Sequence, residues 1–217
     1  MTVRRVHDLA TAAYKAFLDE VEQAILARGR AFVALSGGST PKAVYERLQP
    51  SDLDWSKVEL FFSDERDVPL EDERSNFRMV KQALLNRVEV ATHPLTNAAA
   101  YDQLLRDRLP DGAFDVLLLG MGDDGHTASL FPGSPALLET ERWVVEGPGV
   151  APSPRRFTIT PPVLAKARRV LIFVGGAGKA DVLKEVLEGP PGQHPAQLAL
   201  QGEWLVDEAA ASRLTAD

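Results

Sequence analysis

The sequence predicts an α/β fold with one domain, in which helices cover both faces of a mostly parallel, twisted sheet. Three observations support this fold class: short apolar runs recur along the chain, helical patterns stand between several of them, and no long linker separates two halves. Strands that alternate with helices pair in parallel, because each helix returns the chain to the edge where the next strand begins. A chain of 217 residues can bury a sizeable core in one unit. We therefore expect a single domain over residues 1–217.

The individual elements follow from periodicity and capping residues. Asp8 can cap a first helix that runs to about Arg28, and its apolar stripe comprises Ala10, Ala13, Phe17, Val21 and Ala24. Apolar runs predict strands over 31–35, 58–63, 114–119, 143–145, 157–160 and 170–175, and helical patterns occupy 42–48, 76–87, 101–109 and 180–188. Residues 197–200 and 204–206 are expected to add a strand pair at an edge of the sheet. Surface loops are expected at the stretches rich in glycine and proline, 132–135, 147–154 and 189–195.

Composition excludes several classes of protein. The net charge of −7 argues against nucleic acid or an anionic membrane as a partner, so an anionic ligand would need a local cationic site. The chain has no cysteine, which rules out a disulfide framework and a thiolate nucleophile. No stretch approaches 18 apolar residues, and the N-terminus lacks a signal-peptide pattern. We expect a cytoplasmic protein that is a monomer or a small homo-oligomer.

A glycine-rich loop follows the apolar run 31–35 and precedes a helical pattern. Thr40 is expected to be the N-cap and Pro41 to occupy the first helical turn. Glycines allow a ligand to approach the backbone closely, and N–H groups at the start of a helix attract an anion. The simpler alternative is an ordinary turn between a strand and a helix. The predicted phosphate-binding loop comprises Ser36, Gly37, Gly38, Ser39 and Thr40.

A second glycine-rich loop, 175–179, ends in a lysine. It is not a Walker loop, because Phe173 and Ala180 stand where that motif has its first glycine and its magnesium-binding hydroxyl. Lys179 can still supply a point charge to a phosphate. Arg156 begins the run 157–160 and is the other cation expected to face inward, whereas Arg155 should point the opposite way because side chains alternate along a strand.

Acid–base groups follow two of the predicted strands. Asp124 and His126 lie two residues apart after the run 114–119, and Asp64 and Arg66 follow the run 58–63. Neighbouring ends of parallel strands meet at one rim of a sheet, where open α/β folds bind their ligands. Histidine is suited to proton transfer near neutral pH, and an arginine can offset the charge of an oxyanion. Either aspartate can orient the histidine. The simpler alternatives are a local ion pair between Asp64 and Arg66 and a capping role for His126.

Other chemistries fit the sequence less well. The spacing Gly120-x-Gly122-x-x-Gly125 matches a dinucleotide fingerprint, but Asp123 and Asp124 would place carboxylates where a pyrophosphate must lie. No Gly-x-Ser-x-Gly elbow and no His-x-x-x-His pair occurs, so a serine hydrolase or a histidine-rich zinc site is not expected. Asp124 and His126 alone would hold a metal only weakly. Solvent-exposed positions are expected for the remaining histidines, His7, His93 and His194.

Taken together, these segments resemble the 6-phosphogluconolactonase family over nearly the whole chain. The most specific part is the run Asp-Gly-His-Thr-Ala-Ser-Leu-Phe-Pro at 124–132, and the segments 36–41, 63–66, 75–77, 156–158 and 178–179 support it. The resemblance implies a fold shared with glucosamine-6-phosphate deaminases and ribose-5-phosphate isomerases. It also implies hydrolysis of a phosphorylated sugar lactone, 6-phosphoglucono-δ-lactone, without a metal or another cofactor.

On this interpretation His126 is the general base, Asp124 or Asp64 orients it, and Arg66 stabilises the oxyanion. Arg156 and Lys179 join the loop 36–40 at the phosphate, and Asn76 and Gly122 are expected to contact the substrate. A deaminase is the main alternative, since its loop also contains Asp-Gly-His. There a glutamate precedes the proline, whereas Phe131 occupies that position here and cannot move a proton. A phosphosugar sensor without catalytic activity is the second alternative, although the chain has no basic segment for DNA binding.

Overall fold

The computed structural model describes residues 1–148 and 154–215. Its main sheet has seven strands, which pair in parallel throughout. In spatial order these strands are β1 (Thr2–Val6), β10 (Glu203–Asp207), β9 (Arg169–Val174), β6 (Val116–Gly120), β2 (Ala31–Leu35), β3 (Val58–Phe62) and β5 (Ala91–Thr92). All five residues of β2 are buried, as expected for a central strand covered on both faces. The predicted fold class is confirmed.

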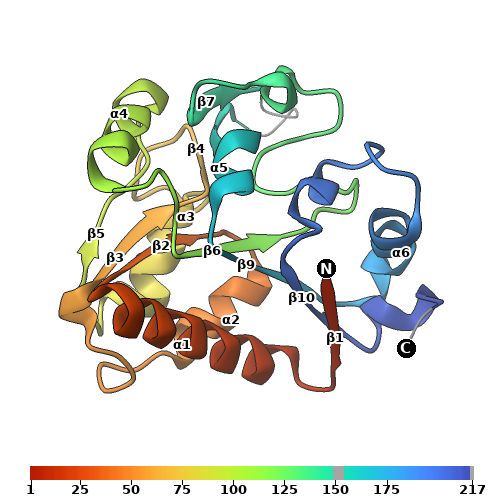
Figure 1. The fold of residues 1–217 in the computed structure, drawn as a ribbon, viewed down its shortest axis with the longest axis horizontal. Helices are drawn as coiled ribbons and strands as arrows, with labels where there is room; N and C mark the ends of the chain where they lie inside the picture. Colours follow the sequence, from red (N-terminus) through yellow and green to blue (C-terminus); the bar gives the residue numbers. More distant parts are fainter. Residues whose placement is uncertain (149–153, 216–217) are drawn as a thin grey trace.

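Helices lie on both sides of this sheet, with α1 and α2 packed together on one side and α4 and α5 on the other (Figure 1). The helices are α1 (Leu9–Arg28), α2 (Ser39–Arg47), α3 (Asn76–Val80), α4 (Ala98–Arg108), α5 (Pro161–Lys166) and α6 (Ala180–Glu188). Short helical turns occur at Trp55–Lys57, Lys81–Leu85, Pro135–Leu138, Ala177–Lys179, Pro195–Ala199 and Ala210–Arg213.

The first helix agrees with its prediction. The Asp8 side chain accepts a hydrogen bond from Thr11 N, and Gly29 ends the helix in the left-handed conformation with φ of 78°. Phe17 and Val21 lie at the centre of its buried stripe, and only Ala10 of the predicted stripe remains half-buried. The predicted helix over 76–87 is divided, because a π-helical turn replaces its second half at Lys81–Leu85.

The end of the chain differs from its prediction. Residues 197–200 are not a strand, since Pro195 begins a 3₁₀ turn there. The strand β10 is not at an edge either, because it pairs on one side with β9 and on the other with β1. The edge is formed by β1, whose Thr-Val-Arg-Arg-Val sequence lacks an apolar run and carries mostly exposed side chains. The predicted loop 147–154 includes residues 149–153, which lie outside the described residues.

A second, smaller sheet was not expected. It is antiparallel, with strand order β4 (Asp64–Arg66), β8 (Arg156–Ile159) and β7 (Val144–Gly147), and it lies on the same side of the main sheet as α4 and α5 (Figure 1). Its register places Arg66 directly opposite Arg156. Residues opposite each other in such a pair project on the same face, so the small sheet brings two arginines together.

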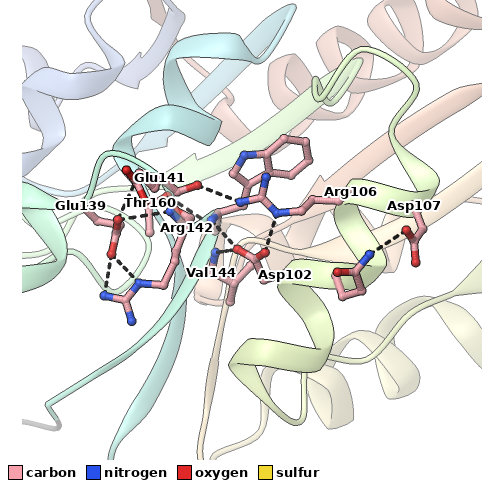
Figure 2. Close-up of polar contacts among 10 residues, drawn as sticks. Asp102, Arg106, Asp107, Glu139, Glu141, Arg142, Val144 and Thr160 are labelled. Carbon is pink, nitrogen blue, oxygen red and sulfur yellow. Dashed lines mark hydrogen bonds and ion pairs between the residues drawn. The ribbon is translucent and has the colours of Figure 1, made fainter.

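Helix α4 holds the chain that leads into this small sheet, as Figure 2 shows. The Asp102 carboxylate accepts hydrogen bonds from the backbone N–H groups of Trp143 and Val144, at 2.5 and 3.1 Å. Arg106 donates to the same carboxylate at 2.7 Å and to the carbonyl of Glu141 at 2.8 Å (Figure 2). Its guanidinium also lies 4.6 Å from the ring centroid of Trp143. These contacts fix the entry into β7, and through β7 they support β8 and Arg156.

Candidate active site

The carboxyl ends of β2, β6 and β9 surround a cavity of about 250 Å³, together with the small sheet. All predicted site residues except Asp124 line this cavity, and Asp124 lies directly behind one of them, His126. Segments from widely separated parts of the chain therefore meet at one place. The lining residues that were predicted are Ser36, Gly37, Gly38, Ser39, Thr40, Asp64, Arg66, Asn76, Gly122, His126, Arg156 and Lys179.

The glycine-rich loop after β2 directs the start of α2 toward the cavity. Helix α2 begins at Ser39 with Gly38 as its N-cap, so the predicted cap at Thr40 is wrong. Gly38 has φ of 108°, a conformation that favours glycine, which lets the chain enter the helix earlier than the hydroxyl at Thr40 suggests. The hydroxyl of Tyr45 accepts from Ser36 N at 3.1 Å and donates to Ser36 O at 2.9 Å, and so fixes the loop from below.

The loop after β6 holds the predicted acid–base pair, Asp124 and His126. Asp124 Oδ1 accepts hydrogen bonds from the backbone N–H of His126, at 3.0 Å, and from its ring Nδ1, at 2.5 Å. Because an ionised carboxylate only accepts, Nδ1 carries the proton, and Nε2 of the neutral ring is left as an acceptor. A Cβ at Gly122 would overlap this ring, so glycine allows the close packing. Burial raises the pKa of Asp124, but the hydrogen bonds from His126 outweigh it, and the pKa lies below its ordinary value of 3.8.

The two candidate aspartates have different partners. Asp64 is buried, and its Oδ2 accepts a hydrogen bond from Ser129 Oγ at 2.6 Å. Its Oδ1 accepts from Asn76 Nδ2 at 3.3 Å. Within the described residues, the carboxylate that hydrogen-bonds to His126 is that of Asp124. Asp64 instead joins β4 to Ser129 and to the start of α3.

Two arginines of the small sheet, Arg66 and Arg156, line the cavity. Arg66 Nη1 donates to Asn76 Oδ1 at 2.6 Å and to the backbone carbonyl of Arg74 at 2.7 Å. The Nε atoms of Arg66 and Arg156 are buried and have no hydrogen-bond acceptor among the described residues. Burial lowers the pKa of Arg156, and the charge of Arg66 lowers it further. Buried, mutually repelling donors of this kind are complementary to an anion. Arg155 points outward to Asp67, at 2.9 Å, as strand alternation predicts.

Lys179 reaches the cavity from the turn that precedes α6. Its Nζ lies 2.5 Å from Oδ1 of Asp123, whose side chain is 85% exposed. The loop before it is held by Asp207, whose carboxylate accepts a hydrogen bond from Gly176 N at 2.9 Å. The lysine is therefore placed at the mouth of the cavity with a carboxylate as its partner.

Comparison with known proteins agrees with the resemblance found in the sequence. Residues 4–206 match the model of a family described as "Glucosamine-6-phosphate isomerases/6-phosphogluconolactonase". The chain belongs to this family. A 6-phosphogluconolactonase of Mycobacterium tuberculosis is 38% identical over 232 residues, covering 95% of this chain and 94% of that protein. One of Synechocystis sp. is 39% identical over 217 residues, covering 89% of each chain.

Solved structures give the same result for the fold. A structure described as 6-phosphogluconolactonase from Trypanosoma brucei has a TM-score of 0.87 at 28% identity, and the match covers 99% of this chain and 98% of that one. A monomeric glucosamine-6-phosphate deaminase has a TM-score of 0.82 at 22% identity, covering 98% of this chain and 100% of that one, and shows that the fold is shared.

Glu65 supports two residues that line the cavity, and the sequence analysis did not identify it. The side chain is buried, and each of its oxygens accepts two hydrogen bonds. Oε1 accepts from the backbone N–H groups of Arg66 and Asn76, and Oε2 accepts from Ser75 Oγ and Phe77 N, all within 2.7–3.0 Å. Burial raises the pKa of Glu65, and the four donors act in the opposite direction. Glu65 thus fixes Arg66 and Asn76 relative to each other; its position inside the Ser-Asp-Glu-Arg run was the available signal.

Solvent-exposed positions were predicted for the three remaining histidines, and this prediction is wrong for two of them. His93 stacks on Phe61, with ring centroids 4.6 Å apart, and its Nε2 lies 3.1 Å from Glu59. The His194 side chain is only 16% exposed and contacts Glu185. Their partners come from other strands and helices, so local polarity gave the wrong prediction. His7 is 92% exposed, as expected.

Proposed function

We propose that this family member hydrolyses 6-phosphoglucono-1,5-lactone to 6-phosphogluconate, the reaction for which its relatives are named, in the oxidative pentose phosphate pathway. The observation that carries the proposal is one cavity that is lined by His126, which is hydrogen-bonded to Asp124, and by the cationic side chains of Arg66, Arg156 and Lys179. A phosphorylated lactone needs both, because its phosphate is a dianion and its ester carbonyl must be attacked by water.

The substrate phosphate binds at the backbone N–H groups of the loop 36–40, with Arg156 and Lys179 neutralising its charge. Binding energy from this remote group orients the lactone toward His126. Asn76 and Gly122 contact the sugar between the two ends. Since the phosphate does not take part in the reaction, its contacts act mainly through orientation and affinity.

His126 acts as the general base. Its Nε2 takes a proton from water while the water oxygen attacks the lactone carbonyl, and Arg66 stabilises the tetrahedral oxyanion. When the ring C–O bond breaks, the imidazolium returns the proton to the departing ring oxygen. Asp124 keeps the imidazole in the required tautomer and offsets the charge that the ring acquires. A positioned base contributes roughly 10²–10⁴-fold, a useful share of the acceleration for an ester that already hydrolyses in water.

This scheme requires no metal ion or cofactor. In residues 1–148 and 154–215, no group of three or more histidine, aspartate or glutamate side chains is placed to hold a metal. No helix in the same part of the chain is long and apolar enough to cross a membrane. A cytoplasmic enzyme that is a monomer or a small homo-oligomer remains our prediction.

Phe131 argues against the deaminase reaction. Its ring packs on His126 with centroids 4.5 Å apart and lies 5.5 Å from the guanidinium carbon of Arg156. The glutamate that assists ring opening in deaminases is thus replaced by a side chain that cannot transfer a proton and that packs against the base.

The proposal is tested by following acid release from freshly prepared 6-phosphogluconolactone, with unphosphorylated gluconolactone and glucosamine 6-phosphate assayed in parallel. We expect hydrolysis of the phosphorylated lactone well above the buffer rate, little effect on the unphosphorylated lactone, and no ammonia from glucosamine 6-phosphate. A chelator should leave the rate unchanged. Binding of phosphosugar without turnover would support a sensor, and ammonia release would support a deaminase; either result would refute the proposal.

A further inference from the structure

The acid–base loop is supported from outside by a segment near the end of the chain. Asp124 and Gly125 do not line the cavity, and their carbonyls both contact the same segment. Ala196 N donates to the carbonyl of Gly125 at 2.9 Å, and His194 Nδ1 lies 3.3 Å from the carbonyl of Asp124. Two consecutive peptide groups of the loop are therefore held by residues about 70 positions later in the chain.

The His194 ring is itself held in place. Its Nε2 lies 2.9 Å from Oε2 of Glu185 on α6, and only 16% of its side chain is exposed. The ring packs directly on Gly125, which has φ of 76°, and a Cβ at that position would overlap the imidazole. A backbone carbonyl only accepts, so a hydrogen bond across the contact with Asp124 has Nδ1 of His194 as its donor.

The loop thus has two sides with different partners. On the inner side, the Asp124 carboxylate contacts the backbone N–H and Nδ1 of His126. On the outer side, the carbonyl of the same Asp124 faces His194. The carbonyl and the carboxylate belong to the same short residue, Asp124. A shift of its peptide group therefore moves the carboxylate relative to the His126 imidazole.

We propose that His194, held by Glu185, is a positioning residue that fixes the Asp124–Gly125 peptide and thereby keeps the Asp124 carboxylate on His126. This inference rests on the proposed function. His194 does not line the cavity and lies behind the loop. Its loss is therefore expected to lower kcat about tenfold, the low end of the range for groups that orient a metal-bound histidine, while KM stays within about twofold.

Three variants and one matched control test the proposal. His194→Ala removes the donor, His194→Asn keeps an amide N–H near the position of Nδ1, and Glu185→Gln keeps an acceptor but removes the charge. His93→Ala is the control, because His93 is also a half-buried histidine paired with a glutamate but does not line the cavity. We expect His194→Ala to lose kcat, His194→Asn to recover most of it, Glu185→Gln to have a smaller effect, and His93→Ala to retain the kcat of the parent enzyme.

A second measurement does not depend on turnover. The chain has four histidines, so the ring ¹⁵N and N–H signals of His126 can be assigned by NMR. His194→Ala should shift these signals and His93→Ala should not, whether or not the lactone is the substrate. The proposal is overturned if His126 signals and kcat are unchanged in His194→Ala, if His194→Asn is as impaired as His194→Ala, or if His93→Ala causes an equal loss.

Discussion

The cavity has two groups of polar residues, called here its acid–base end (Asp124 and His126) and its cationic end (Arg66, Arg156 and Lys179). They differ in how completely their polar atoms are hydrogen-bonded within the protein. At the acid–base end, Asp124 and His126 are hydrogen-bonded to each other. At the cationic end, Nε of Arg66 and Nε of Arg156 are buried and have no acceptor among the described residues, and the pKa of Arg156 is lowered by burial and by Arg66. The ion-pair partner of Lys179 at the same end is Asp123, whose side chain is exposed.

This difference indicates that the two ends have different roles. The acid–base end is preorganised by contacts within the chain, which favours a constant geometry for proton transfer. The cationic end gathers two arginines whose Nε atoms are buried and a lysine whose partner is an exposed aspartate, which favours binding of a dianion. Substitutions at the first end should lower kcat, and substitutions of the proposed phosphate ligands at the second end, Arg156 and Lys179, should raise KM. Arg66 lies beside Arg156 but is assigned to the oxyanion, so its substitution should lower kcat.

The largest effect is expected for His126→Ala. Loss of the general base should lower kcat by roughly 10²–10⁴-fold. Affinity for 6-phosphogluconate should remain, since the loop 36–40, Arg156 and Lys179 are untouched. Initial rates with fresh lactone and calorimetric titration with 6-phosphogluconate measure the two quantities. An unchanged kcat would remove His126 from the mechanism.

Asp124→Asn should be the next largest, with a loss of kcat of about tenfold to hundredfold. The amide can donate to Nδ1, which favours the tautomer in which Nε2 carries the proton and cannot accept one. The pKa of Asp124 lies below 3.8, so this carboxylate stays ionised above pH 5 and should not itself cause any change of kcat between pH 5 and 9. If kcat of the parent enzyme falls toward acid pH within that range and this fall is absent in Asp124→Asn, the assignment is contradicted.

Asp64→Asn is the matched variant for the other candidate aspartate. Ser129 Oγ and Asn76 Nδ2 are donors to this buried carboxylate, so the substitution should cost about 1–3 kcal/mol in the free energy of unfolding. Its kcat per folded molecule should fall less than that of Asp124→Asn. Urea denaturation and active-site titration separate the two effects, and the opposite ranking of kcat would make Asp64 the partner of His126.

The sequence was sufficient for the fold class because central strands such as β2 consist of uninterrupted apolar residues, which have no other place than the interior. It was also sufficient to predict which residues lie together, because the carboxyl ends of parallel strands meet at one edge of the sheet. It was not sufficient to choose between Asp64 and Asp124. Both aspartates follow an apolar run. The choice depends on Ser129, which lies 65 residues after Asp64 in the chain and whose Oγ donates a hydrogen bond to the Asp64 carboxylate.

Contacts between distant segments account for the other failures. The small antiparallel sheet has strands of three or four residues, too short for a clear periodicity, and Arg66 meets Arg156 only through its register. The strand β1 is half polar and becomes a strand because β10 lies beside it. His194 was assigned to solvent because the residues next to it are polar or proline, whereas Gly125 and Glu185 bury it.

At the cationic end, Arg156→Ala and Lys179→Ala should raise KM by about tenfold to hundredfold, the range for a hydrogen bond between charged groups. Because the phosphate does not react, kcat should change much less. Arg155→Ala is a matched control on the same strand, since its guanidinium pairs with Asp67 outside the cavity. Saturation kinetics with the phosphorylated lactone measure both constants. A loss confined to kcat would place these cations at the reacting carbonyl.

The smallest effect is expected for Asp123→Asn, which should lower KM, whereas the substitutions of Arg156 and Lys179 should raise it. The Asp123 carboxylate neutralises Lys179 and must be displaced, or must tolerate a second anion, when a phosphate binds. Removing its charge should therefore lower KM, by no more than about fivefold because an exposed ion pair is weak. Inhibition by inorganic phosphate should strengthen by the same factor, and both effects should shrink as salt rises. A higher KM in Asp123→Asn would show that the aspartate positions the lysine rather than competing with the substrate for it.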